Sequence, residues 1–236
     1  MKIDMHVHTI YSFHPLWRHD CYSRPEQVIK QAVRRGLGGL AVTDHDTISG
    51  SRAAARAAKT INKDFFILPA AEIRSLEGDI LGYGINEEIP RKLTPEETIE
   101  RINSQGGFAV IAHPFPNHFY GMLINKKTWT AERVANLFRE FGQGKLGIET
   151  FNSGNPKEGD NRALTLAGKL GARITAGSDS HILPSVGMAG LELEGDPLTA
   201  VMKGRAKVWG RHIPFSYKPR MYWIKWWNLF RKTNME

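Results

Sequence analysis

The stretch Lys2-Ile-Asp-Met-His-Val-His8, at the start of the chain, decides the fold. Its apolar and polar residues alternate, which is typical of a β-strand with one face in a core. His6 and His8 are two residues apart, so both project from the same face, and we expect Asp4 on that face as well. A second apolar run at 39–43 ends in the same manner, because Thr43-Asp-His-Asp-Thr47 follows it. The sequence therefore predicts buried strands that end in histidines and carboxylates.

Short β-branched runs alternate with longer amphipathic ones, as expected for successive strand and helix units around a parallel sheet. The expected strands are 2–8, 39–43, 65–73, 80–85, 108–112, 147–151, 172–176 and 190–193. The expected helices are one from Pro25 to the residues before Gly36, followed by 49–61, 93–105, 131–141, 161–170 and 198–203. Ser23 and Thr94 each precede a proline and a glutamate, which predicts that they cap the first and third helices.

The bulk properties favour one soluble α/β domain. The chain has 236 residues, 41% hydrophobic and 24% charged, and this length suits a single β/α barrel. Cys21 is the only cysteine, so an intramolecular disulfide and a cysteine-rich zinc cluster are both excluded. Neither a signal peptide nor an apolar run of about 18 residues is found, which predicts a cytoplasmic protein.

The C-terminal segment 213–236 differs in composition from the rest of the chain, and we expect 1–212 to form the barrel. The net charge is +8, and about half of this excess lies in the last tenth of the sequence. On a helix over 218–232, four aromatic side chains would share one face. Two interpretations stay open: an interfacial helix at the inner face of a membrane, or a helix that docks on the barrel or on a second subunit.

Most predicted strands carry a histidine or a carboxylate near one end. In a β/α barrel the C-terminal ends of the strands meet at one rim, where active sites of this architecture lie. Imidazole and carboxylate suit zinc, manganese and iron. The residues that can bind a metal ion in this way are His6, His8, His45, Glu72, Asp79, His113, Asp179 and His181.

Five motifs in this order resemble the polymerase and histidinol phosphatase (PHP) family of metal-dependent phosphoesterases. They are Asp4-Met-His-Val-His-Thr9, Thr43-Asp-His-Asp-Thr47, Ala71-Glu-Ile73, Ala112-His-Pro114 and Gly177-Ser-Asp-Ser-His181. The resemblance extends from Met1 to about Arg211. It implies a single domain with a distorted (β/α)7 TIM-like barrel and a trinuclear metal centre.

The resemblance also assigns individual ligands. It implies that His6, His8, Glu72 and Asp179 surround one ion, that Glu72 bridges to a second ion bound by His113, and that His14, His45 and His181 bind the third. His14 stands eight residues after His6, where family members carry Asp or His. Asp79 stands where many members have a histidine on the second ion, so this chain departs from the pattern there. Glu72, Asp179 and His181 are the candidate catalytic residues.

Such a centre predicts hydrolysis of a phosphate ester by a hydroxide that bridges two of two or three divalent ions. The third ion would offset the charge that develops on the phosphate. The expected substrate is a small phosphomonoester or a nucleotide, with Arg18, Arg24, His118 and Arg162 as candidate substrate-binding residues. Long nucleic acid is not expected, because the charge outside the tail is modest.

Two other functions and several local roles stay open. The chain could be a 5′-3′ exonuclease or oligonucleotidase, or a non-catalytic membrane-binding or partner-binding module with structural metals. Asp44 either orients His45 or closes a local turn, and Glu149 and Asn152 lie where they could reach the cluster. The aromatic segment 114–130 forms either a substrate lid or a loop packed over the barrel end.

Overall fold

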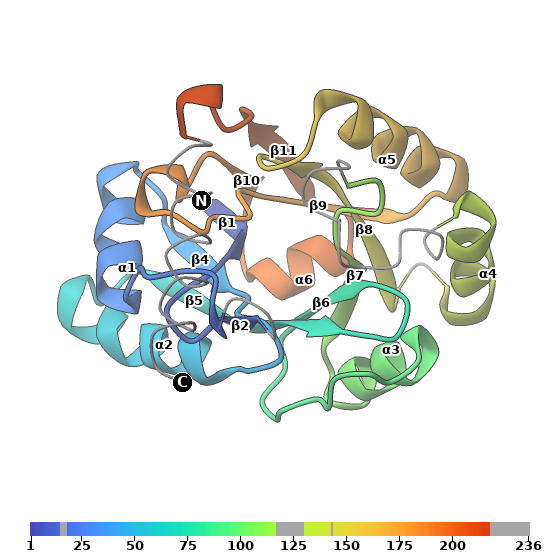
Figure 1. The fold of residues 1–236 in the computed structure, drawn as a ribbon, viewed down its shortest axis with the longest axis horizontal. Coiled ribbons are helices and arrows are strands. Elements are labelled where there is room, and N and C mark those ends of the chain that lie inside the picture. Colours follow the sequence, from blue (N-terminus) through green and yellow to red (C-terminus); the bar gives the residue numbers. More distant parts are fainter. Residues whose placement is uncertain (15–17, 117–129, 143, 218–236) are drawn as a thin grey trace, which may run out of the picture.

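The computed structural model describes residues 1–14, 18–116, 130–142 and 144–217. Its main feature is a nine-stranded sheet that curves into a nearly closed barrel, in the order β11-β10-β1-β4-β5-β6-β7-β8-β9 (Figure 1). The strands are β1 (Lys2–Val7), β4 (Gly39–Val42), β5 (Phe66–Arg74), β6 (Asp79–Tyr83), β7 (Phe108–Ile111), β8 (Leu146–Asn152), β9 (Arg173–Gly177), β10 (Ala189–Leu193) and β11 (Ala206–Gly210). This arrangement confirms the expected single-domain α/β barrel.

The barrel closes where the segment after β9 meets β1. Asp179 donates its backbone N–H to the carbonyl of His6 at 2.8 Å, and His8 donates to the carbonyl of Ser180 at 3.1 Å. Gly177 allows this approach, since a Cβ atom there would lie 2.2 Å from the Cβ of His6. Seven strands, β1 and β4 to β9, therefore form the ring, and β10 pairs with the opposite half of β1.

Helices α1 to α5 cover the outside of the ring, and α6 lies at one of its ends (Figure 1). They are α1 (Pro25–Arg34), α2 (Ser49–Ile61), α3 (Pro95–Ser104), α4 (Ala131–Phe141), α5 (Lys157–Leu170) and α6 (Pro197–Met202), with short 3-10 turns at Leu183–Ser185 and Phe215–Tyr217. Thr94 caps α3 as predicted, because its hydroxyl accepts the N–H of Glu97 at 3.2 Å. The prediction for Ser23 is wrong: Arg24 is the N-cap of α1, and its N–H donates to the side chain of Gln27 at 2.9 Å.

Two features differ from a regular β/α repeat. β6 runs antiparallel to β5 and β7, because only four residues join β5 to β6 and a parallel crossover needs a dozen or more. The first residues of β6 consequently lie at the same rim as the last residues of the parallel strands. β11 and the hairpin of β2 (Phe13–His14) and β3 (Arg18–His19) were not predicted, since neither has a long apolar run.

A β-bulge in β1 sets the direction of the metal-capable side chains. The register between β1 and β4 shifts between Asp4 and Val7, which inverts the alternation of side chains. Ile3 and Met5 belong to the buried cluster inside the ring, which includes residues of β5 to β7 and of α6, whereas Val7 packs with α1 and α2. Asp4 therefore does not share a face with His6 and His8, which corrects the expectation from simple alternation.

The opposite end of the barrel is filled by α6. Ala200 and Val201 of α6 pack within the interior cluster, and Arg173 at the start of β9 donates to the carbonyl of Met202 at 2.9 Å. One end of the ring is thus apolar and closed, and the other end is left for polar side chains. None of the helices in the described part of the chain has the length and apolarity needed to cross a bilayer.

Candidate metal centre

Glu72, near the end of β5, lies at the centre of the polar rim. Its Oε1 atom is 3.0 Å from Nε2 of His113, and its Oε2 atom is 3.2 Å from Nε2 of His8 and 3.3 Å from Nε2 of His6. The Oε2 atom is also 3.3 Å from Nδ1 of His45. Side chains from β1, from the loop after β4 and from the loop after β7 therefore converge on one buried carboxylate.

Asp179 joins the same cluster from the loop after β9. Its Oδ1 atom lies 3.2 Å from Nε2 of His8 and 3.5 Å from Nε2 of His6, and these two histidine nitrogens are 3.2 Å apart. Two ligand atoms bound about 2.1 Å from one ion, at tetrahedral or octahedral angles, lie roughly 3.0–3.4 Å apart. The spacing of these donor atoms fits a shared divalent ion.

A second group of ligands forms around Asp20, which the sequence interpretation did not include. The Oδ2 atom of Asp20 lies 3.5 Å from Nε2 of His45 and 3.6 Å from Nε2 of His181. Asp20 is buried, and its Oδ1 atom has no hydrogen-bond partner among the described residues. A buried carboxylate oxygen without a partner is costly unless a cation neutralises it, so this group also fits a metal ion.

The hairpin β2–β3 explains how Asp20 reaches this place. Phe13 pairs with His19 and His14 pairs with Arg18, so the chain leaves the rim after Ser12 and returns to it at Asp20. Counting eight residues from His6 gave His14, but the hairpin makes Asp20 the residue that follows the return. The backbone of His14 lies in β2, and its side chain is outside the described part of the structure.

Asp79 lies at this rim although it begins its strand, because β6 is antiparallel. One of its oxygens lies within 4.8 Å of ligand atoms of both Glu72 and His45. Burial and the charge of Glu72 raise the pKa of Asp79 to about 7. Two buried carboxylates this close are stabilised by a shared proton or by a cation, and a metal ion on this side would take the place of the proton.

The electrostatics of the cluster favour ligation. Burial alone would raise the pKa of Glu72 and Asp179, but the neighbouring imidazoles outweigh it and hold both pKa values well below their ordinary range. Burial lowers the pKa of His45 well below its ordinary value, which keeps this imidazole neutral. For His6, His8 and His113 the neighbouring carboxylates outweigh burial and raise the pKa, so these imidazoles would release a proton when they bind a metal ion. Neutral imidazole and ionised carboxylate are the forms that bind metal ions.

Two of the rim residues are held in a strained backbone conformation. His113 has φ 27° and Asp179 has φ 49°, in the left-handed region that non-glycine residues rarely adopt. Such strain persists only where the surroundings fix it, and it is common at functional sites. Both side chains are also partly exposed, 19% for His113 and 21% for Asp179, whereas His6 and His8 are buried. The cluster thus has a buried floor and a side that faces solvent.

Asp4 and Asp44 accept hydrogen bonds from backbone N–H groups and do not belong to the cluster of metal-capable side chains. Asp44 accepts the N–H of Thr9 at 2.5 Å and its hydroxyl at 2.6 Å, so of its two expected roles the structure has the local one and not the orientation of His45. Asp4 accepts backbone N–H groups of Ser178 and Gly187 at 2.9 and 2.8 Å. These carboxylates fix the loops that carry the ligands.

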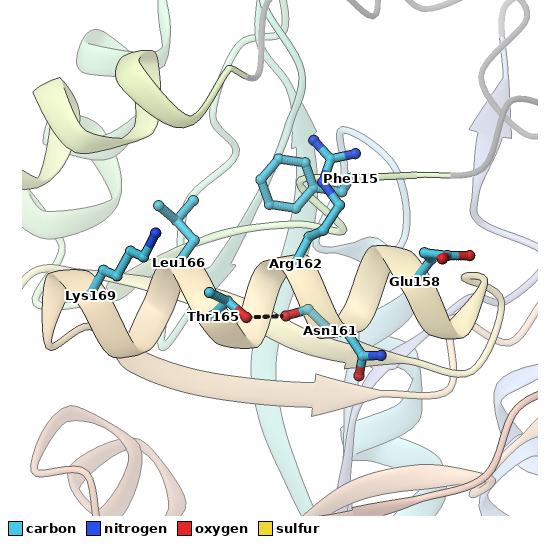
Figure 2. Close-up of a pocket in the computed structure, with 7 residues that line it drawn as sticks. All are labelled: Phe115, Glu158, Asn161, Arg162, Thr165, Leu166 and Lys169. Carbon is cyan, nitrogen blue, oxygen red and sulfur yellow. Dashed lines mark hydrogen bonds between the residues drawn. The ribbon is translucent and has the colours of Figure 1, made fainter.

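The two candidate substrate-binding residues whose side chains the structure describes, Arg24 and Arg162, lie on different helices. Arg162 lies on α5, with its guanidinium carbon 4.1 Å from the centre of the Phe115 ring. Both residues line a pocket of about 420 Å³ beside α5 (Figure 2). Arg24 is the exposed N-cap of α1. His118 and the side chain of Arg18 lie outside the described residues, as do most of the aromatic segment 114–130 and the tail from 218 onward.

Similarity to known proteins agrees with the fold. The family model PHP_C, PHP-associated, matches residues 158–200. The uncharacterised protein MJ1587 of Methanocaldococcus jannaschii is 40% identical over 119 residues, which are 49% of this chain and 68% of that protein.

Two solved structures share the fold. A two-domain protein from Bacteroides vulgatus containing a predicted PHP-like metal-dependent phosphoesterase has a TM-score of 0.69 and 17% identity, over 95% of this chain and 69% of that one. The lesion-specific endonuclease PfuEndoQ from Pyrococcus furiosus has a TM-score of 0.59 and 16% identity, over 88% of this chain and 57% of that one. The chain belongs to the PHP family of metal-dependent phosphoesterases.

Proposed function

We propose that this phosphoesterase hydrolyses a small phosphomonoester or a nucleotide with two or three divalent ions held at the barrel rim. The observation that carries the proposal is that the two oxygens of Glu72 contact different groups of histidines. Oε1 contacts His113, and Oε2 contacts His6 and His8 of β1. A carboxylate that offers one oxygen to each of two ligand groups is suited to bridging two ions.

The donor groups suggest how the ions are divided. His6, His8, Asp179 and Glu72 would hold the first ion, and Glu72 with His113 and Asp79 would hold the second. His45, His181 and Asp20 would hold the third, with His14 as a further candidate. Imidazole and carboxylate ligands accept zinc, manganese and iron, and the extra oxygen of Asp79 favours the harder ions among these at the second position.

When bound, ions in such a site lower the pKa of water and neutralise charge on the phosphate. The protein's own contribution is placement of the ligands and of nearby protons. Asp179 and His181 both face solvent, and Nδ1 of His181 is 3.5 Å from Oδ1 of Asp179. These two side chains are therefore placed beside the position that the reacting ester would take, while the buried Glu72 is suited to keep its charge.

Recognition of the rest of the substrate is a separate requirement. Arg18, Arg24, Arg162 and His118 remain candidates for contacts with the phosphate or the leaving group. Arg162 is supported by its place beside Phe115, which follows His113 by two residues. A phosphodiester substrate is the alternative, because the Pyrococcus furiosus neighbour is an endonuclease with the same fold.

The test is hydrolysis by protein that has been stripped of metal and reloaded with Mn²⁺, Zn²⁺ or Fe²⁺. The substrates should include sugar phosphates, nucleotides, histidinol phosphate and short oligonucleotides. We expect metal-dependent release of phosphate from one of the monoesters, lost in His113→Ala. Cleavage confined to oligonucleotides would support the phosphodiester alternative, and inactivity of fully loaded protein on every substrate would overturn the proposal.

A further inference from the structure

Glu149 on β8 is a buried carboxylate that belongs to no ligand group, yet both of its oxygens face elements that carry ligands. Its Oε1 atom lies 2.9 Å from Nδ1 of His6. Its Oε2 atom accepts the backbone N–H of His113 at 2.9 Å and the side-chain amide of Asn152 at 3.0 Å. Glu149 as a whole residue is only 2% exposed, so water has little access to these contacts.

The contact with His6 determines which of its nitrogens faces the cluster. An ionised carboxylate can only accept hydrogen bonds, so His6 must present a proton on Nδ1 to Glu149. In the neutral imidazole that binds a metal ion the lone pair is then on Nε2, the atom that points at Glu72, His8 and Asp179. A metal-bound histidine commonly donates its other N–H to a carboxylate in this way, which fixes the ring and raises its basicity.

The second oxygen fixes the strained ligand of the neighbouring loop. The backbone of His113 has φ 27°, and its N–H is held by Oε2 of Glu149 while its Nε2 atom points at Glu72. The amide of Asn152, which also donates to this oxygen, lies 3.3 Å from Oδ2 of Asp179. Three segments that carry ligands, namely β1 and the loops after β7 and β9, are thus joined through one side chain and its amide neighbour.

We propose that Glu149 is a positioning residue. It sets the tautomer of His6 and the orientation of His113, and it thereby determines how tightly the side chains of the rim bind a metal ion. Its effect on turnover rests on the proposed function, but its effect on metal binding does not. Glutamine at this place has one acceptor and one NH₂ group. If the NH₂ group faces the backbone N–H of His113, two donors face each other. If it faces His6, it forces His6 to carry its proton on Nε2, where a metal ion would bind.

The experiment compares Glu149→Gln with the wild-type chain by chelator competition with Mn²⁺ and Zn²⁺. We expect the affinity of the tightest ion to fall about 10- to 100-fold, the range seen for partners of metal ligands. Glu88→Gln is the control, because Glu88 also accepts several donors, but these come from Thr47 and Ile48, which precede α2 and are not metal-capable residues. Its metal affinity should equal that of the wild type.

A spectroscopic measurement separates positioning from a loss of stability. In the zinc-loaded wild type, ¹⁵N NMR should show His6 with a proton on Nδ1 and the metal on Nε2. Ligation of His6 through Nδ1 would overturn the inference even if Glu149→Gln does not fold. A variant that melts earlier without metal, yet keeps the wild-type affinity and the same tautomer, would also overturn it. A wild-type chain that binds metal without hydrolysing any ester would contradict the proposed function alone.

Discussion

Glu72 stands 3.0 Å from Nε2 of His113 through one oxygen, and directs its other oxygen to histidines on different elements. A single side chain therefore connects metal-capable histidines that lie far apart in the sequence, on β1 and in the loops after β4 and β7. The burial of Glu72 strengthens this role, because the high dielectric constant of water would weaken the attraction between an exposed carboxylate and a cation.

We expect Glu72→Gln to lower both metal affinity and turnover by at least about 100-fold, because the amide is neutral and can accept through only one oxygen. The metal content after dialysis and the kcat on the best substrate are the measurements. Glu77→Gln is the matched control. Glu77 forms an ion pair with Arg133, with 2.7 Å between Oε2 and Nε, and this pair does not involve the residues of the cluster. Equal metal content in the two variants would refute a bridging role.

Asp20→Asn should remove one ion selectively. Asp20 contacts His45 and His181, and the contacts of Glu72 with His6 and His113 do not involve it. We expect metal content to fall by about one ion per chain and kcat to fall about 10- to 100-fold, with the remaining ions bound as before. His14→Ala is the comparison, and a larger loss in that variant would assign the third position to His14 instead.

The sequence predicted the barrel and most of the rim because both depend on local patterns. Short apolar runs predict the strands. A polar residue at the end of such a run can be identified from the sequence without knowing which distant residues it contacts. Asp179 and His181 are predicted in this way, and the structure places Asp179 3.2 Å from His8 and His181 3.6 Å from Asp20. The antiparallel direction of β6 did not prevent the prediction of Asp79, because reversal places its first residue at the same rim.

The sequence did not predict features that depend on insertions and bulges. A count of residues cannot reveal that the β2–β3 hairpin removes a segment from the rim and returns the chain at Asp20. Strict alternation likewise placed Asp4 with His6, whereas the bulge in β1 separates them. For Glu149 the sequence predicts only a place near the cluster, because no sequence pattern indicates that a side chain accepts a hydrogen bond from a distant backbone N–H.

Gly177→Ala should strongly destabilise the fold. A Cβ at Gly177 would lie 2.2 Å from Cβ and 2.6 Å from the backbone N of His6, and neither strand can move without breaking the barrel closure. We expect a loss of about 3 kcal/mol, which corresponds to roughly 6–12 °C in Tm for a chain of this size. Thermal unfolding followed by circular dichroism measures it.

Gly168→Ala is the control for that variant. Gly168 lies in the exposed part of α5, and a Cβ there would meet nothing within 4 Å. Alanine favours a helix over glycine by about 0.5–1 kcal/mol, so Tm should stay the same or rise slightly. A similar fall in both variants would mean that the approach of β9 to β1 is not the cause.

Asp160 on α5 should make stability depend on pH. Burial, with the charge of Glu149, raises the pKa of Asp160 to about 7, although hydrogen bonds from Asn155 and Asn152 oppose the shift. The folded state therefore binds a proton more tightly than the unfolded chain, in which the pKa is close to 3.8. The stabilisation is complete below that value and is lost as the pH rises through about 7.

Asp160→Asn imitates the protonated form, and so it should matter only where the wild-type side chain is ionised. We expect the variant to exceed the wild type in free energy of unfolding by about 1–2 kcal/mol at pH 8.5, after allowance for solvent screening. At pH 5 the difference should be less than half as large, because the loss of stabilisation begins above the unfolded pKa of 3.8 and is complete only above about 7. Urea unfolding at both pH values provides the comparison, and a difference that is the same at pH 5 and pH 8.5 would mean that the lost oxygen, and not the charge, is responsible.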